Sequence, residues 1–102
     1  MRFSNLPATV VAAIAVKAID AKYVPMFGNG HRWVFVFANG YAASVVKNIG
    51  SYGDDCDLWE LAVMKKGDDG WAVCCDSPIT DDVLGWLDES EVVETCLNIS
   101  AL

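Results

Sequence analysis

Three aspartates surround a cysteine in Asp54-Asp55-Cys56-Asp57, inside the glycine-flanked stretch GSYGDDCDLWE. Carboxylate oxygens are the ligands that calcium prefers, and an EF-hand loop alternates them, with a glycine at its sixth position and a glutamate at its twelfth. Counted from Asp55 the sixth residue is Glu60, and counted from Asp57 the alternation of acids fails. We therefore expect no metal here, and interpret the stretch as a solvated or partner-facing acidic loop.

Four cysteines and a single histidine raise the question of a zinc centre or a thiol nucleophile. Zinc takes four thiolate or imidazole ligands in a tetrahedron. Cys74 and Cys75 are adjacent in a predicted strand, where neighbouring side chains point to opposite faces, and the sequence has no CxxC pair. An enzyme would need His31 as a base beside Cys56 or Cys75, which is the third and least favoured hypothesis, because an exposed histidine at the start of a strand explains His31 without catalysis. We interpret the cysteines as core residues, and predict no catalytic residue, no metal and no cofactor.

Charge is divided unequally along the chain. Residues 1–53 carry five basic residues against one acid, and residues 54–102 carry two against thirteen, so that +4 and −11 make up the net charge of −7. Phosphates are bound by lysine and arginine, so the second half is unsuited to direct nucleic-acid binding and suited to a basic protein surface. The acids predicted to contact such a partner are Asp54, Asp55, Asp57, Asp68, Asp69, Asp81, Asp82 and Glu89.

The length and composition indicate one globular domain. With 102 residues, of which 54% are apolar, residues 1–102 can bury a single core. The apolar stretch Ala8–Val16 is far shorter than the ~20 residues that span a bilayer. Pro7 and the lack of a small-x-small cleavage site argue against a signal peptide. We therefore expect a cytoplasmic protein with reduced thiols and no membrane partner.

The first predicted element is a helix over Ala8–Lys22, which is rich in alanine and has no glycine. Ser4 or Asn5 can cap it, and Pro7 suits its first turn. Because the helix is apolar over most of its circumference, we expect it to be buried on more than one side. It would then lie deep against a sheet, or use its second face against another subunit.

A hairpin is the clearest local signal. Asn39-Gly40 separates the β-rich runs HRWVFVFA and YAASVVK, which predicts a two-residue type I′ turn. In that register Phe37 faces Ala42 and Trp33 faces Val46. Since both faces are apolar, the hairpin should lie at the centre of a sheet that is covered on two sides.

Two further strands and two short helices follow. Leu58–Lys65 and Trp71–Asp76 are predicted to be paired strands around a turn at residues 66–70. Asp81–Leu87 and Glu91–Leu97 are predicted to be short helices, the first capped by Thr80 or Asp81 and the second by Asp88 or Ser90. No βαβ unit is present. The predicted fold class is therefore α+β, with an N-terminal helix, a four-stranded antiparallel β meander and two short C-terminal helices.

Three segments carry a family resemblance: Asn39-Gly40-Tyr41, Trp59–Val63 (WELAV) and residues 79–87 (ITDDVLGWL). From about residue 33 to 102 the chain resembles small phage and prophage proteins that combine an NGY hairpin, a WELAV strand and a closing ITDDV(L/I)GxL segment. These motifs are structural, so the resemblance implies no catalytic residue. Small acidic phage proteins that block host defences, including anti-CRISPR proteins, are similar in size and charge, an analogy of class alone.

Two hypotheses of function follow. The first is a non-enzymatic phage-type inhibitor in the cytoplasm of an infected or lysogenic bacterium. It would bind a basic surface of a host nucleic-acid-handling defence complex, as a nucleic-acid mimic and without contacting nucleic acid itself. The alternative is a homo-oligomeric structural or accessory phage protein, such as a homodimer, with the helix Ala8–Lys22 as its interface.

Overall fold

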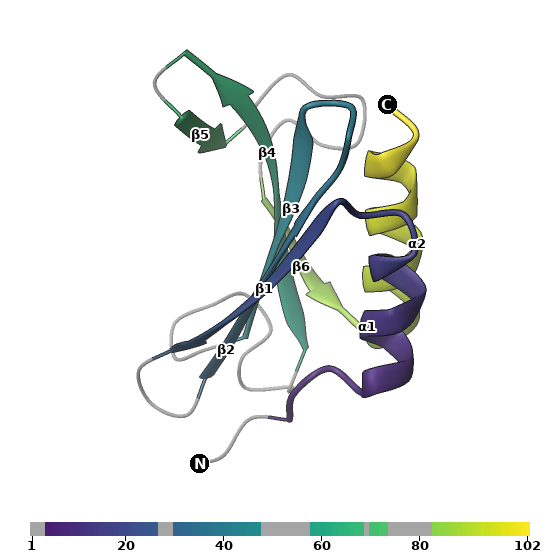
Figure 1. Cartoon of the computed structure of the whole chain (residues 1–102). Coiled ribbons are helices and arrows are strands. Elements are labelled where there is room, and N and C mark those ends of the chain that lie inside the picture. The colour runs from purple at the N-terminus through teal and green to yellow at the C-terminus, as the bar shows by residue number, and fades with distance from the viewer. Residues whose placement is uncertain (1–3, 27–29, 48–57, 69, 74–82) are drawn as a thin grey trace.

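The computed structural model describes residues 4–26, 30–47, 58–68, 70–73 and 83–102. These residues form one antiparallel sheet with two helices packed on one of its faces (Figure 1). The α+β class is therefore confirmed, whereas the predicted number of elements is wrong. The elements are α1 (Ala8–Ala15), β1 (Asp20–Met26), β2 (Gly30–Val36), β3 (Tyr41–Lys47), β4 (Trp59–Gly67), β5 (Gly70–Val73), β6 (Leu84–Leu87) and α2 (Glu89–Ser100).

The sheet has six strands instead of the four predicted. Its order is β1-β2-β3-β4-β5, and β6 also pairs with β4. β5 pairs with β4 along Met64–Gly67 and β6 pairs near Trp59 and Leu61, while β3 occupies the opposite edge of β4. The strands β5 and β6 therefore share one edge of β4, and β6 leads directly into α2.

The prediction of a helix over Ala8–Lys22 is wrong beyond its first half. α1 ends at Ala15, and β1 begins at Asp20 and pairs with β2 over seven consecutive positions. Tyr23-Val24-Pro25 favours an extended backbone, and pairing with β2 satisfies backbone groups that a longer helix would keep to itself. In α1 only Ile14 is fully buried, so the expectation of a helix buried on several sides is also wrong.

The start of α1 is not capped by a side chain. Pro7 occupies the N-cap position, and the Asn5 side chain is used elsewhere. Its Oδ1 accepts hydrogen bonds from the Leu6 backbone N–H and from Trp33 Nε1, both at 2.8 Å. Asn5 therefore ties the segment before α1 to strand β2 and does not act as the predicted cap.

The predicted helix Asp81–Leu87 is wrong where the structure describes it. Leu84–Leu87 is strand β6, and Trp86 has a φ of 63°, which cannot continue a right-handed helix. Of the two predicted C-terminal helices, the described residues therefore contain only the second, α2, which is longer than the predicted Glu91–Leu97. Asp88 is its N-cap, one of the two caps proposed from the sequence.

The hairpin between β2 and β3 has a three-residue loop instead of a two-residue one. The Phe37 N–H donates to the Tyr41 carbonyl at 2.9 Å, which leaves Ala38, Asn39 and Gly40 in the loop. A type I′ turn needs positive φ at two residues, but here only Gly40 has it, at 87°. The register is therefore shifted by one position from the prediction, with Phe35 opposite Ala43 and Trp33 opposite Val45.

Asn39 is placed by side-chain contacts instead of by an unusual backbone. Its Oδ1 accepts the Tyr41 N–H at 3.0 Å. Its Nδ2 donates to the carbonyls of Ile99, at 2.9 Å, and Leu102, at 3.1 Å. Because the last carbonyls of a helix lack intrahelical partners, Asn39 fastens the hairpin to the end of α2.

Gly40→Ala should destabilise the protein by about 1–2 kcal/mol, because a Cβ is disfavoured in the left-handed region. The space around the position is open, so the cost is conformational and not steric. Gly67→Ala is the matched control, since its Cβ would meet only the Gly70 carbonyl at an ordinary 3.7 Å. Urea unfolding of both variants measures the difference, and equal stabilities would contradict the loop geometry.

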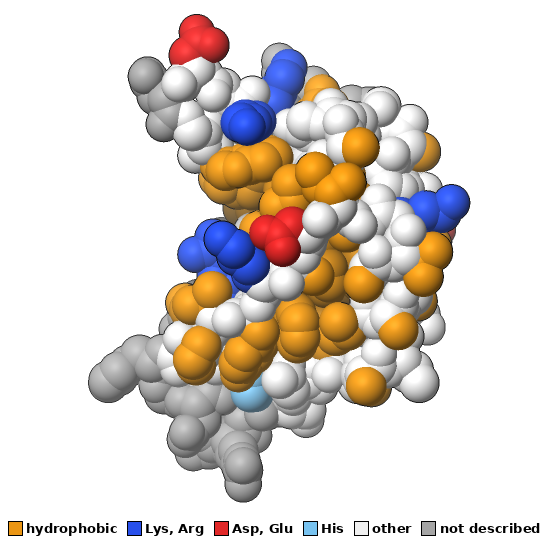
Figure 2. Space-filling view, viewed as in Figure 1, with side chains coloured by type: hydrophobic (Ala, Val, Ile, Leu, Met, Phe, Trp, Pro, Cys, Tyr) orange, Lys and Arg blue, Asp and Glu red, His pale blue; other side chains and the backbone are white. Residues whose placement is uncertain are grey.

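The core lies between the helices and one face of the sheet. Phe35, Ala43, Val45, Leu61 and Val63 point to this side, where they meet residues of α1 and α2. No described helix covers the opposite face, so the expectation of two covered sides is not met by the described residues. That face is hollowed, and hydrophobic side chains gather in it (Figure 2).

Candidate protein-interaction surface

Only two of the eight acids predicted to bind a partner fall within the described residues. Asp68 is exposed in the turn between β4 and β5, and Glu89 is exposed at the start of α2. These two places lie at opposite ends of the molecule (Figure 1), so Asp68 and Glu89 do not share a face. Outside the described residues lie Asp54, Asp55, Asp57, Asp69, Asp81 and Asp82.

The described acids gather at the start of α2 instead. Asp88, Glu89, Glu91 and Glu94, here called the α2 acids, are all exposed. Neither α1 nor α2 contains a lysine or an arginine. Sequence reasoning singled out Glu89 alone as a contact. A sequence feature that could have indicated Asp88, Glu91 and Glu94 is the lack of any basic residue from Trp71 to the last residue. These acids therefore have no counter-charge nearby in the sequence.

Two of the α2 acids are accounted for by the helix itself. Asp88 Oδ1 accepts the Glu91 N–H at 2.8 Å, and Glu91 Oε1 accepts the Asp88 N–H at 3.1 Å. This reciprocal pair is a capping box, which satisfies two of the free N–H groups at a helix start. Within the described part of the chain, the carboxylates of Glu89 and Glu94 have no such partner. No described residue therefore competes with an outside cation for these two carboxylates.

An apolar groove runs beside these two glutamates. Its apolar lining is Val10 of α1 with Val93 and Leu97 of α2, and Glu89, Ser90 and Glu94 complete it. The three apolar side chains are half-buried, and the groove encloses about 470 Å³. Glu89, Val93 and Leu97 follow each other at intervals of four residues, so they lie along one line of the helix. The surface of α2 thus joins an apolar strip to two unpaired carboxylates.

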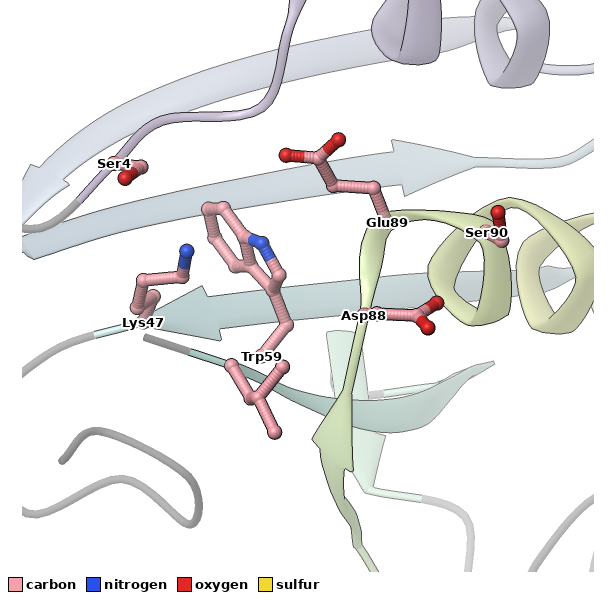
Figure 3. Close-up of a pocket in the computed structure, with 7 residues that line it drawn as sticks. Ser4, Lys47, Trp59, Asp88, Glu89 and Ser90 are labelled. Carbon is pink, nitrogen blue, oxygen red and sulfur yellow. The ribbon is translucent and has the colours of Figure 1, made fainter. Parts of the chain in front are cut away.

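A second pocket lies below the start of α2 (Figure 3). It encloses about 320 Å³ and is lined by Ser4, Lys47, Leu58, Trp59, Asp88, Glu89 and Ser90. The Lys47 ammonium lies 4.3 Å from the centroid of the Trp59 ring, a cation–π contact. Lys47 is 2% exposed and Trp59 is 1% exposed. Because the Lys47 and Trp59 side chains are buried, and none of the described lining residues is a histidine or a cysteine, we interpret this pocket as structural.

His31 lies next to Tyr23 on the neighbouring strand. Its Nδ1 lies 2.6 Å from the Tyr23 hydroxyl on the adjacent strand, and its ring packs against the Tyr23 ring. The cysteines considered as nucleophiles, Cys56 and Cys75, lie outside the described residues, as does Cys74. Cys96 is described, and it is fully buried in the core on α2. It therefore acts as a small apolar residue.

Cys96 should make stability depend on pH. Burial raises the pKa of this thiol from its ordinary value of 9.0 to about 12. Above pH 9 the unfolded chain loses the proton and the folded chain keeps it, so stability should fall by up to about 1.4 kcal/mol per pH unit towards pH 12. Urea unfolding of the native chain and of Cys96→Ala between pH 8 and pH 11 measures this. Parallel curves for the two proteins would contradict it.

No group of three or more His, Cys, Asp or Glu side chains that could hold a metal ion occurs in the described ranges. None of the helices described is long and apolar enough to cross a membrane. Comparison of the chain with protein-family models, curated proteins and solved structures finds no match.

Proposed function

We propose that this chain is a small non-catalytic inhibitor that binds a basic, nucleic-acid-binding surface of a host defence complex through the α2 acids. The observation that carries the proposal is the acidic start of α2, with four exposed carboxylates and no basic residue in either helix. Glu89 and Glu94 make no ion pair among the described residues. These two carboxylates can therefore pair with a lysine or arginine of another protein.

The spacing of these charges supports competition with nucleic acid. From Asp88 to Glu94 the helix rises by about 9 Å, at 1.5 Å per residue. Four carboxylates over this length approach the charge density of duplex DNA, which is one charge per ~1.7 Å of its axis. A groove lined by lysine and arginine would therefore attract α2 much as it attracts phosphates. Such attraction chiefly raises the association rate.

The kind of partner is proposed from the resemblance to phage proteins. A bacterial defence complex that handles nucleic acid, such as a CRISPR effector, has the required basic groove. The chain would then act in the cytoplasm of an infected or lysogenic bacterium. It would bind protein and no nucleic acid, because the α2 acids repel phosphates.

Capture from host lysate tests this proposal. The immobilised chain should retain a nucleic-acid-binding complex at 0.1 M salt and release it at ~0.5 M, because the Debye length falls well below its value of about 10 Å at 0.1 M. The control is a variant with Glu89→Gln and Glu94→Gln, which should retain much less. Retention that is indifferent to salt and to these substitutions would contradict the proposal.

A second candidate, self-association, is favoured by exposed apolar residues near the end of α1. Val16 is 79% exposed and Ile19 is 69% exposed, and the adjacent strand β1 lies at the edge of the sheet. A second copy could cover this region, in a homodimer of a structural or accessory protein. Sedimentation of the pure protein decides between the two. A monomer at all accessible concentrations would remove the second candidate.

A further inference from the structure

The groove between α1 and α2 is a candidate binding site for a third helix. Val93 and Leu97 are one turn apart on α2, and Val10 of α1 closes the floor from the other side. The exposed positions of α1 carry short side chains, so no long side chain of α1 stands over the groove. These positions are Ala8, Thr9, Ala12 and Ala13. A helix can therefore approach α1 and α2 closely.

Charge restricts what can occupy the groove. Glu89 and Glu94 line the same groove as the apolar side chains, so any segment that covers the floor also covers these carboxylates. A covered carboxylate that loses water without gaining a cation is strongly unfavourable. The occupant must therefore present lysine or arginine next to its apolar side chains.

A second copy of the chain does not meet this requirement at a two-fold interface. An interface of that kind places the same surface on both partners, so Glu89 and Glu94 of each copy would be covered by a second groove of the same acidic composition. Like charges in contact oppose association. Neither helix carries a lysine or an arginine that could compensate.

We infer that the groove binds a basic amphipathic helix of the partner, with an aliphatic side chain lying between Val10, Val93 and Leu97 and with lysine or arginine paired to Glu89 and Glu94. This is the helix-in-groove mode of recognition, in which apolar side chains one turn apart on the bound helix enter the groove. The inference rests on the proposed function and deepens it, because it names the segment that the α2 acids select.

A pair of peptides tests the inference directly. The first probe is a labelled helical peptide of ~18 residues, made of leucine and lysine with the leucines on one face. The second has the same composition in an order that leaves no apolar face. Fluorescence anisotropy at 0.1 M salt should show that the first binds at least ~10-fold more tightly, because burial of each methylene group adds to its affinity.

Variants assign the binding to the groove. Val93→Ala should weaken binding of the first peptide by roughly 10-fold, since two methyl groups leave the groove floor. Glu94→Gln should weaken it by about 2- to 5-fold. The matched controls are Val24→Ala and Asp68→Asn, which remove an exposed apolar side chain and an exposed carboxylate elsewhere, and should change binding by less than ~2-fold. Thermal unfolding shows whether each variant is folded. If Val93→Ala is not folded, the comparison of peptide binding by Glu94→Gln with peptide binding by Asp68→Asn decides whether the groove is the binding site.

The outcomes separate this inference from the proposed function. If both peptides bind equally and Asp68→Asn weakens binding as much as Glu94→Gln, the groove is overturned while electrostatic attraction stands. If the first peptide binds through Val93 but is indifferent to salt, the apolar groove stands as a binding site, whereas the pairing to Glu89 and Glu94 fails together with the electrostatic proposal. Binding of neither peptide at low salt overturns both.

Discussion

Reversing the two unpaired carboxylates, by Glu89→Lys together with Glu94→Lys, should weaken binding to the captured partner roughly 30- to 150-fold. Each reversal removes one attraction and adds one repulsion. At solvent-exposed pairs each such contribution is about 0.2–1 kcal/mol, so the four contributions total about 1–4 kcal/mol, and we take the middle of that range, about 2–3 kcal/mol. Most of the loss should be in the association rate, because these charges act before contact is made.

The fold should survive this double reversal. Both side chains are exposed, and neither belongs to the capping box formed by Asp88 and Glu91. A lysine in the first turn opposes the helix dipole by about 0.3–1 kcal/mol, which is a small part of the stability of a domain. Association rates of both proteins, measured at several salt concentrations with the purified complex, test the prediction. Asp68→Lys is the control, and an equal loss with it would show that only net charge matters.

Trp59→Ala should lower the free energy of unfolding by about 3–5 kcal/mol. Trp59 is 1% exposed and lies opposite Leu87 of β6. Its removal leaves a cavity between the sheet and the start of α2, and takes the aromatic ring away from the buried Lys47 ammonium. Since a domain is stable by only about 5–15 kcal/mol, a large fraction of this variant should be unfolded on mild heating.

Trp71→Ala is the matched control for Trp59→Ala. Trp71 lies on β5 and is 41% exposed, so it leaves no enclosed cavity when it is truncated. Its loss should cost less than about 1.5 kcal/mol. Urea unfolding followed by circular dichroism compares the two variants. Equal costs would contradict the placement of the core between β4 and the helices.

The sequence was informative where an element has a covered and an uncovered face. β4 alternates buried Trp59, Leu61 and Val63 with half-buried neighbours, and its strand pattern was recognised. α2 was recognised by its cap and its apolar residues. In β1, by contrast, six of seven residues are exposed, so no periodicity marked it as a strand. Pairing with β2 decided its structure, and that pairing is not a local property.

Of the candidate surface, only the negative charge could be predicted from the sequence. Counting charges predicted that the second half of the chain would carry the binding acids, and of the acids named only Asp68 and Glu89 lie within the described residues, where both are exposed. The groove could not be predicted, because it exists only where Val10 meets Val93 and Leu97, more than eighty residues later in the chain. Which acids flank it depends on how α1 packs against α2. That packing is set by the whole core.

Displacement of nucleic acid tests the central claim most directly. The purified partner complex is loaded with a labelled nucleic acid and titrated with the chain at 0.1 M salt, and fluorescence anisotropy reports the bound label. We predict that the native chain displaces the label stoichiometrically, and that the variant with Glu89→Lys and Glu94→Lys requires a concentration roughly 30- to 150-fold higher. Binding of the chain that leaves the label in place, or equal displacement by the two proteins, would contradict the account.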